Sequence, residues 1–175
     1  MKYSVMVEYA LHSLVYLIDV PAQESIGIKD LSEFQGLSET YLSKVFGKLS
    51  KAGIVSSVPG VNGGYKLAKF PEEISFWEVI QAVEGAKPIF QCKNVLKNNL
   101  MHVDKEEHEK DTECSACTPG NPTCTINLVM LEAEQHMREF LQNKTLAWLN
   151  DELDLVLPKK IRVDSSEYFR RNHSN

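Results

Sequence analysis

The chain has 175 residues, of which 43% are hydrophobic and 25% charged, and this composition is ordinary for a soluble globular protein with a real core. No apolar run approaches the roughly 20 residues that cross a bilayer, and the start of the chain lacks a signal-peptide pattern. We therefore expect a cytoplasmic protein without a membrane partner. The net charge of −5 argues against a nonspecific coat on nucleic acid.

A first helix is predicted over residues 3–20, where nearly all side chains are apolar. Three of the polar exceptions, Ser4, Glu8 and His12, are four residues apart and therefore share one face of the helix. Pro21 ends the helix, because proline lacks the backbone N–H that a helix interior needs.

Two further helices follow, with a short turn between them. The first is expected over residues 29–34, and Gly36 supplies the turn. Ser38 is a suitable N-cap for the second helix, which runs to about Ala52 and is closed by Gly53. Together these elements predict a helix-turn-helix motif, whose second helix enters the major groove of DNA.

A β-hairpin is predicted directly after this motif. Residues 54–58 alternate like a strand, residues 59–64 contain the proline, asparagine and glycines of a turn, and residues 65–67 return as a second strand. A hairpin in this place is a wing. Its glycines would let the backbone approach a phosphate or the minor groove closely.

Basic residues gather in the same region. No acidic residue lies between Glu39 and Glu72, whereas five lysines do: Lys44, Lys48, Lys51, Lys66 and Lys69. A basic stripe on an otherwise acidic protein is expected of a surface that contacts DNA. A lysine-rich face that is merely solvated would give the same pattern.

A further helix over residues 75–84 precedes a long segment, residues 86–124, that lacks helical or strand periodicity. Loops of this length are usually functional or disordered. The segment holds all the cysteines of the chain, which are Cys92, Cys114, Cys117 and Cys124. Thiols clustered in this way indicate one reactive or metal site in a reducing compartment.

Several chemistries suit these cysteines. Thiolates bind iron–sulfur clusters and zinc, and Cys114 and Cys117 have the spacing of a zinc knuckle. A reversible disulfide is the third possibility. Thiol oxidoreductases use the same Cys-x-x-Cys spacing, but no buried strand precedes it here, so we do not expect an enzyme.

A long helix is predicted from Thr125 onward. Its apolar residues step by threes and fours and form a seam of Ile126, Met130, Ala133, Met137 and Phe140. Such a seam is typical of a dimerisation helix, although a helix packed within its own domain looks similar. One more short helix is expected around Trp148, and the tail beyond Pro158 is expected to be disordered.

Four stretches of the chain resemble the Rrf2 family of bacterial transcriptional regulators: residues 37–44, 51–57, 63–67 and 74–85. The combination of Leu-Ser-x-x-Tyr-Leu in the first stretch with Gly-Gly-Tyr in the third is specific, and the likeness covers roughly residues 1–150. The resemblance implies a homodimer with two winged helix-turn-helix units, a long helix near the C-terminus, and a pseudo-palindromic operator in double-stranded DNA.

The resemblance also assigns candidate DNA contacts by position. They are Ser38, Thr40, Tyr41, Lys44 and Lys48 on the recognition helix, and Asn62, Gly63 and Lys66 on the wing. Hydroxyls and lysines suit phosphate contacts, and no arginine is present for bidentate recognition of guanine. Many family members carry a basic residue before the wing glycine, where this chain has Pro59. We therefore expect Asn62 and Lys66, rather than position 59, to make the wing's contacts with DNA.

Family members that bind an iron–sulfur cluster carry three cysteines between the helix after the wing and the long helix. Cys92, Cys117 and Cys124 take these places, and Cys117 fits the usual short spacing to Cys124 better than Cys114 does. The inserted residues 93–113 and the extra thiol of Cys114 depart from the family pattern.

The resemblance implies a further ligand from the first helix of the partner subunit. In some members an acidic residue or a histidine of that helix completes the cluster, and Glu8 and His12 stand at these positions. Ligands other than thiolates tune the lability and potential of a cluster. A solvated polar stripe would account equally well for the two residues.

The sequence therefore predicts a mainly α-helical DNA-binding regulator, a winged helix-turn-helix with a small β-hairpin wing and a long C-terminal dimerisation helix. We expect a repressor that senses a 2Fe–2S or 4Fe–4S cluster, or redox or nitrosative state. The alternatives are a zinc-stabilised or thiol-switched regulator, or one controlled by a protein partner. The expected parts are a winged domain (1–85), a sensor loop (86–124), a dimerisation region (125–157) and a disordered tail (158–175).

Overall fold

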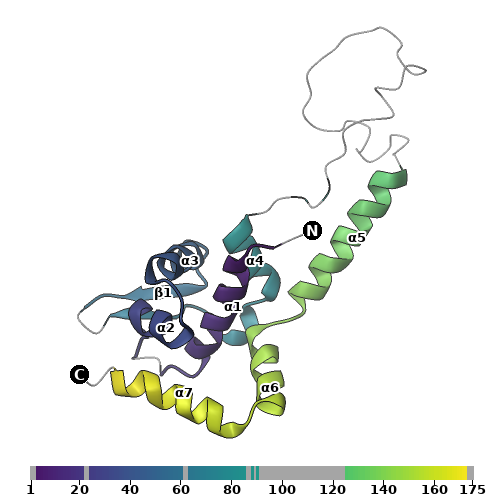
Figure 1. Ribbon diagram of the computed structural model, residues 1–175. Helices are drawn as coiled ribbons and strands as arrows, with labels where there is room; N and C mark the ends of the chain where they lie inside the picture. Colours follow the sequence, from purple (N-terminus) through teal and green to yellow (C-terminus); the bar gives the residue numbers. More distant parts are fainter. Residues whose placement is uncertain are drawn as a thin grey trace. The chain divides into compact units, whose positions relative to one another are not determined.

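The computed structural model describes residues 3–21, 24–60, 63–85, 88, 90 and 125–172 (Figure 1). The chain divides into two compact units, residues 1–86 with 140–175, and residues 87–139. In chain order the elements are α1 (Val5–Ile18), α2 (Ile28–Gln35), α3 (Glu39–Lys51), β1 (Val55–Val58), β2 (Gly64–Leu67), the 3₁₀ turn η1 (Pro71–Glu73), α4 (Phe76–Glu84), α5 (Thr125–Gln142), α6 (Leu146–Val156) and α7 (Lys159–Asn172). The mainly helical fold with one hairpin is the predicted one.

The helix-turn-helix forms where the sequence predicts it. Gly36 adopts φ 65° after α2, a left-handed conformation that ends helices and favours glycine. The Ser38 hydroxyl then caps α3 by accepting a hydrogen bond from the Tyr41 N–H at 3.4 Å. Gly53, at φ 69°, leads out of the helix into β1.

The wing is a two-stranded antiparallel hairpin in which Val55 pairs with Leu67 and Val58 with Gly64. Its glycines are required by the fold itself. A Cβ at Gly64 would lie 2.3 Å from the Ile26 carbonyl oxygen, and one at Gly63 would lie 2.4 Å from the Val58 carbonyl oxygen. The approach of Ile26 follows from its bridge to Tyr65, which ties the segment before α2 to β2.

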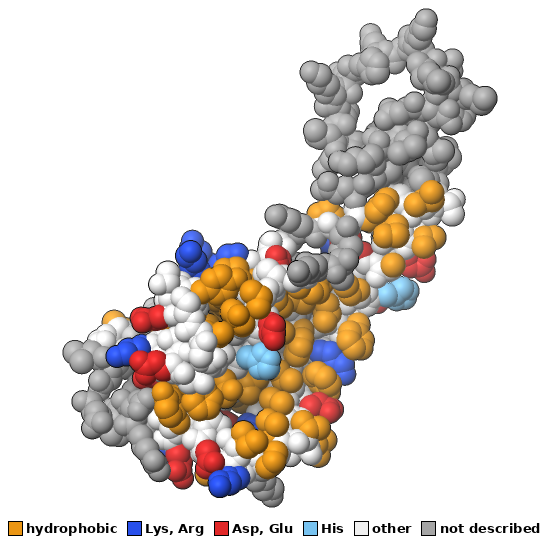
Figure 2. Space-filling view, in the orientation of Figure 1, with side chains coloured by type: hydrophobic (Ala, Val, Ile, Leu, Met, Phe, Trp, Pro, Cys, Tyr) orange, Lys and Arg blue, Asp and Glu red, His pale blue; other side chains and the backbone are white. Residues whose placement is uncertain are grey.

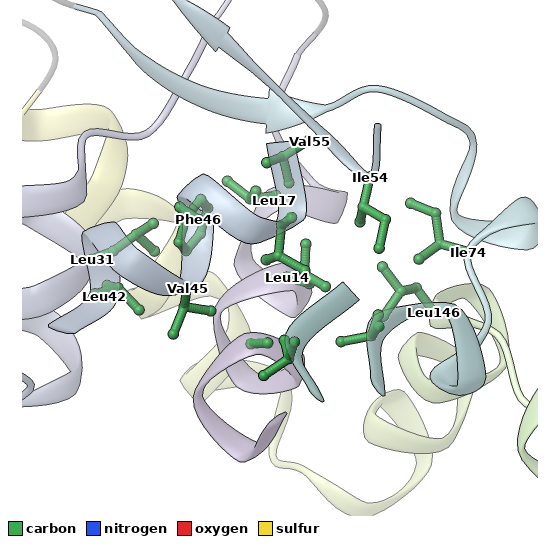
Figure 3. Packing of buried hydrophobic residues seen from close by; sticks show 14 of the residues in the cluster. Leu14, Leu17, Leu31, Leu42, Val45, Phe46, Ile54, Val55, Ile74 and Leu146 are labelled. Atoms are coloured by element: carbon green, nitrogen blue, oxygen red, sulfur yellow. The ribbon is translucent and has the colours of Figure 1, made fainter. Parts of the chain in front are cut away.

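One hydrophobic core lies between α1, α3, α4 and the hairpin, and α6 contributes to it (Figure 3). Its largest fully buried side chains include Leu14, Leu17, Leu42, Phe46 and Leu146. Full burial of one such side chain stabilises the fold by about 1.5–3 kcal/mol. The core therefore fixes the orientation of α3, whose opposite face remains exposed.

A short backbone link joins α6 to the start of α4. The Phe76 N–H donates to the Lys144 carbonyl oxygen at 2.8 Å, and the Leu146 N–H donates to the Ile74 carbonyl oxygen at 2.9 Å. Ser75 caps α4 between these two bonds, and the Glu78 carboxylate completes the capping box by accepting from the Ser75 N–H. The helix predicted around Trp148, α6, thus lies in the same compact unit as α4, residues 1–86 with 140–175, which we call the winged unit.

The prediction of a disordered tail is wrong for residues 159–172, which form helix α7. An aromatic cluster explains the helix: Phe169 is buried and packs 5.5 Å from Tyr16 and 5.0 Å from Phe34, between ring centroids. Figure 1 shows α7 below α1 and α2 in the same unit. The spacing of Ile161, Ser165 and Phe169 is helical and could have indicated this element from the sequence.

Helix α5 begins at Thr125, as predicted, and exposes apolar side chains along its length. Ile126 is 69% exposed, Val129 57% and Phe140 63%, whereas Asn127 and Glu134 are buried. Figure 2 shows hydrophobic side chains on the visible surface of this helix. No helix among the described residues is both long and apolar enough to cross a membrane.

Candidate DNA-binding surface and sensor residues

The exposed face of α3 presents hydroxyl and ammonium groups. Thr40, Ser43 and Lys44 are all exposed, and they lie on the side of the helix opposite the buried Leu42, Val45 and Phe46. Ser38 is exposed as well, and its oxygen is engaged in capping the helix. These groups can donate to phosphate oxygens and to base edges.

The tyrosines of α3 and β2 take different places. Tyr41 is half-buried and packs edge-to-face on Tyr9 of α1, with ring centroids 5.7 Å apart. Tyr65 is also half-buried and lies 4.9 Å from Phe46 of the core. Tyr65 is thus a packing residue. Tyr41 lies at the margin of the exposed α3 face, and part of its ring packs against Tyr9.

The lysines of the basic stripe separate into distinct environments. Lys44 and Lys51 are exposed. The Lys48 ammonium donates a hydrogen bond to the Val83 carbonyl oxygen near the end of α4. Lys66 is half-buried on β2, where it pairs with Ser56 in the hairpin register.

Lys69, which the sequence places in the same stripe, pairs with Glu78 at 3.0 Å between Nζ and Oε1. Burial by itself would raise the pKa of the Glu78 carboxyl. The hydrogen bond from the Ser75 backbone and the hydrogen bond and charge of Lys69 outweigh burial and hold this pKa below its usual value. Lys69 and Glu78 therefore stabilise the start of α4. Lys44, Lys48 and Lys51 are the exposed lysines of α3, and Lys48 is the one that donates to the Val83 carbonyl oxygen.

The tip of the wing is described only in part. Pro59 and Gly60 are exposed, and Gly60 has φ 127°, which favours glycine. Gly63 is half-buried, and the close approach of Val58 and Gly60 requires it to lack a side chain. Asn62 lies outside the described residues.

The candidate sensor residues fall into two groups. Cys92, Cys114, Cys117 and Cys124 all lie outside the described residues. Glu8 and His12 lie one turn apart on α1, and both are exposed while the opposite face of the helix enters the core. In the parts of the chain that are described, no three His, Cys, Asp or Glu side chains are grouped as a metal site.

A recognition helix held by a core on one side, exposed on the other and followed by a hairpin defines a winged helix-turn-helix protein. Residues 3–152 match the model of the Rrf2 family, described as an iron-dependent transcriptional regulator. The chain belongs to the Rrf2 family of DNA-binding transcriptional regulators. The predicted class, a regulator and not an enzyme, is confirmed.

Similar proteins agree with this membership. The chain is 31% identical over 156 residues to the HTH-type transcriptional regulator NsrR of Halalkalibacterium halodurans, covering 87% of this chain and 94% of that protein. It is 29% identical over 173 residues to the HTH-type transcriptional regulator IscR of Vibrio cholerae, covering 97% and 84%. The solved structure of T. potens IscR is 25% identical with a TM-score of 0.60, covering 91% and 93%.

Proposed function

We propose that this chain is a homodimeric transcriptional repressor whose affinity for its operator depends on an iron–sulfur cluster bound by the cysteine segment. The match to an iron-dependent regulator family over residues 3–152 carries this proposal. The exposed α3 face, the exposed apolar side of α5 and the clustered thiols each support one part of it.

DNA binding is assigned to the exposed face of α3 and to the wing. Lys44 would neutralise a phosphate, and Thr40 and Tyr41 would contact phosphates or base edges beside it. The remaining proposed contacts are Ser38, Lys48, Asn62, Gly63 and Lys66. Lys48 is the weakest of the helix contacts, because its ammonium already donates to the Val83 carbonyl oxygen.

Dimerisation is assigned to α5. Ile126 and Phe140 of the predicted seam are more than half exposed, together with Val129 beside it. Large apolar side chains in a row on one helix stabilise a protein when a second copy covers them. A parallel or antiparallel pair of α5 helices would bury this row in the manner of a coiled coil.

The donor chemistry of the cysteine segment fits an iron–sulfur cluster. Cys92, Cys117 and Cys124 supply three thiolates, and Cys114 supplies a fourth candidate. The exposure of Glu8 and His12 leaves either of them accessible for a fourth ligand donated to the cluster of a partner subunit. When bound, the cluster would supply a redox-active and chemically labile centre, while α3 and the wing make the contacts with DNA.

Zinc is the second candidate, favoured by the knuckle spacing of Cys114 and Cys117. A zinc site would be structural and would carry no redox signal. The two cofactors differ in colour, because iron–sulfur clusters absorb visible light and zinc thiolates do not.

The test is the visible absorption spectrum of the anaerobically purified protein, together with iron, sulfide and zinc analysis. We expect a coloured protein with iron and sulfide in stoichiometric amounts. The colour should be lost in Cys117→Ala and retained in the matched Cys114→Ala variant. A colourless protein with one zinc per chain would contradict the cluster, and colour lost only in Cys114→Ala would contradict the ligand assignment.

A further inference from the structure

A cavity of about 280 Å³ lies between α1, α2, α6 and α7, beside the segment that leads from α1 to α2. It belongs entirely to the winged unit. Protein interiors are packed as densely as organic crystals, and voids larger than a water molecule are few. At about 30 Å³ for each water, this cavity has room for roughly nine waters. Its volume is close to that of the smallest pockets that hold organic ligands.

The walls of the cavity are mainly apolar and come from every element around it. The apolar lining includes Val15, Tyr16, Ile26, Phe34, Leu157 and Phe169. Tyr16, Phe34 and Phe169 lie against one another, with ring centroids 5.0–5.5 Å apart. Aromatic side chains offer faces and edges to a flat ring in offset or edge-to-face contact. The shape and chemistry of the walls therefore favour a small aromatic molecule.

The charged side chains around the cavity cancel one another. Asp19 and Glu24 are acidic, and Arg162 and Arg170 are basic. Arg162 is committed to hydrogen bonds with Asp19 at 3.0 Å, Asp154 at 2.7 Å and the Asn150 side chain at 2.6 Å. A carboxylate bound to Arg162 would have to displace one of these partners, and Asp19 and Glu24 in the lining would repel an anion, so the lining favours an uncharged ligand over an anion.

We propose that this cavity binds a small, uncharged aromatic molecule. The ligand would contact α7 on one side and Phe34 of α2 on the other, so that its binding stabilises the packing of α7 on the helix-turn-helix. His12, a candidate cluster ligand, is among the residues that line the cavity, but none of the cysteines is. Failure of ligand binding here would therefore leave the proposed binding of a cluster by the cysteines unaffected.

The test is isothermal titration calorimetry of the full chain with indole, an uncharged bicyclic aromatic molecule. We expect saturable binding at one site per chain with a Kd on the order of 1 mM or lower, the range for a ligand of this size. Indole-3-acetate carries the same ring with a carboxylate, and we expect it to bind at least tenfold more weakly. Equal binding of the two compounds would overturn the assignment to an uncharged ligand.

Two matched variants locate the site. Leu157→Trp adds bulk at a residue that lines the cavity, whereas Leu155→Trp makes the same change two residues away, at a side chain that is 81% exposed. We expect Leu157→Trp to weaken indole binding at least tenfold and Leu155→Trp to leave it unchanged, with circular dichroism confirming that both are folded. Ser166→Phe fills the cavity from α7 and replaces Leu157→Trp if that variant does not fold. Indole binding that survives cavity filling, or the absence of saturable binding by the parent protein, would overturn the proposal.

Discussion

At the residue scale, lysines that look equivalent in the sequence have different roles in the fold. Lys44 is exposed on α3, Lys48 donates to the Val83 carbonyl oxygen, and Lys69 is paired with Glu78. The sequence predicts the basic stripe but not this division, because the partners of Lys48 and Lys69 are reached only after α4 packs against α3. A charge that is already paired within the protein contributes less to DNA binding than an exposed one.

We expect Lys44→Ala to weaken binding to duplex DNA of any sequence and to reduce the salt dependence. Each lost phosphate contact lowers the slope of log K against log salt by about 1. Fluorescence anisotropy of a labelled duplex at several salt concentrations measures both quantities. Lys69→Ala is the matched control, since Lys69 is paired with Glu78 and its loss should leave the salt slope unchanged. Equal slopes for the parent protein and Lys44→Ala would remove Lys44 from the contact surface.

Glu78 gives the fold a pH dependence whose sign follows from its lowered pKa. The carboxyl is more acidic in the folded protein than its ordinary value of 4.5, so folding favours the ionised form. Its stabilisation is therefore complete at neutral pH, and is lost as the pH falls below 4.5 and through the folded pKa. The side chains of Glu78 and Lys69 are 34% and 37% exposed, so solvent screens the pair.

We expect Glu78→Gln to lower the free energy of unfolding by about 0.5–1 kcal/mol at pH 7, the magnitude of a helix-start carboxylate and an exposed ion pair. The difference between the two proteins should be smaller at about pH 3 than at pH 7, because the stabilisation by the ionised carboxyl is lost as the pH falls below 4.5 and through the lowered folded pKa. Urea unfolding at both pH values measures it. A difference that is the same at both values would show that the charge of Glu78 has no part in the stability of α4.

At the element scale, the helix-turn-helix and wing follow from local signals in the sequence. Gly36, Ser38 and Gly53 mark the ends of α2 and α3, and each has the predicted role. Helix α7 was missed because its stability comes from distant residues. Phe169 is buried only because Tyr16 and Phe34, far away in the sequence, meet it in the fold. The helical spacing in α7 is present in the sequence, but it does not show which residues the helix packs against.

Helix α5 differs from α7 in both respects. Its apolar pattern predicts a helix from the sequence, and its apolar residues remain exposed in the single chain. We expect Ile126→Asp to shift the protein from dimer to monomer at micromolar concentration in sedimentation velocity, because a charge in an apolar interface is costly to bury. Leu155→Asp is the control, an equally drastic change at an exposed apolar residue of α6. A dimer that persists in Ile126→Asp would exclude this end of α5 from the interface.

At the scale of the whole molecule, α4 and α6 belong to the same compact unit although they are far apart in the sequence. The hydrogen bonds that join Phe76 to Lys144 and Ile74 to Leu146 fix the start of α6 to the segment before α4. The sequence predicts both helices but not this link, since a two-residue bridge between distant segments has no local signature.

The DNA-binding class was predictable because its motifs are local, whereas the sensor site depends on residues from separate parts of the chain. Glu8 and His12 are placed by α1, and their exposure agrees with a ligand role without assigning one. The four cysteines were identified by residue type and spacing alone. Chemical analysis of the purified protein, together with the effect of the cofactor on DNA binding, is therefore what identifies the cofactor.

Selection of duplexes from a random-sequence library, with anaerobically purified protein before and after metal removal by a chelator, tests the central claim most directly. We expect the selected duplexes to share a pseudo-palindrome with half-sites about 10 base pairs apart, as two recognition helices of a dimer require. Metal removal should change the affinity for that sequence at least tenfold, corresponding to a coupling of about 1.4 kcal/mol or more. A shared sequence bound equally well with and without metal would contradict metal-dependent regulation, and the absence of any shared palindrome would contradict the dimeric winged-helix account.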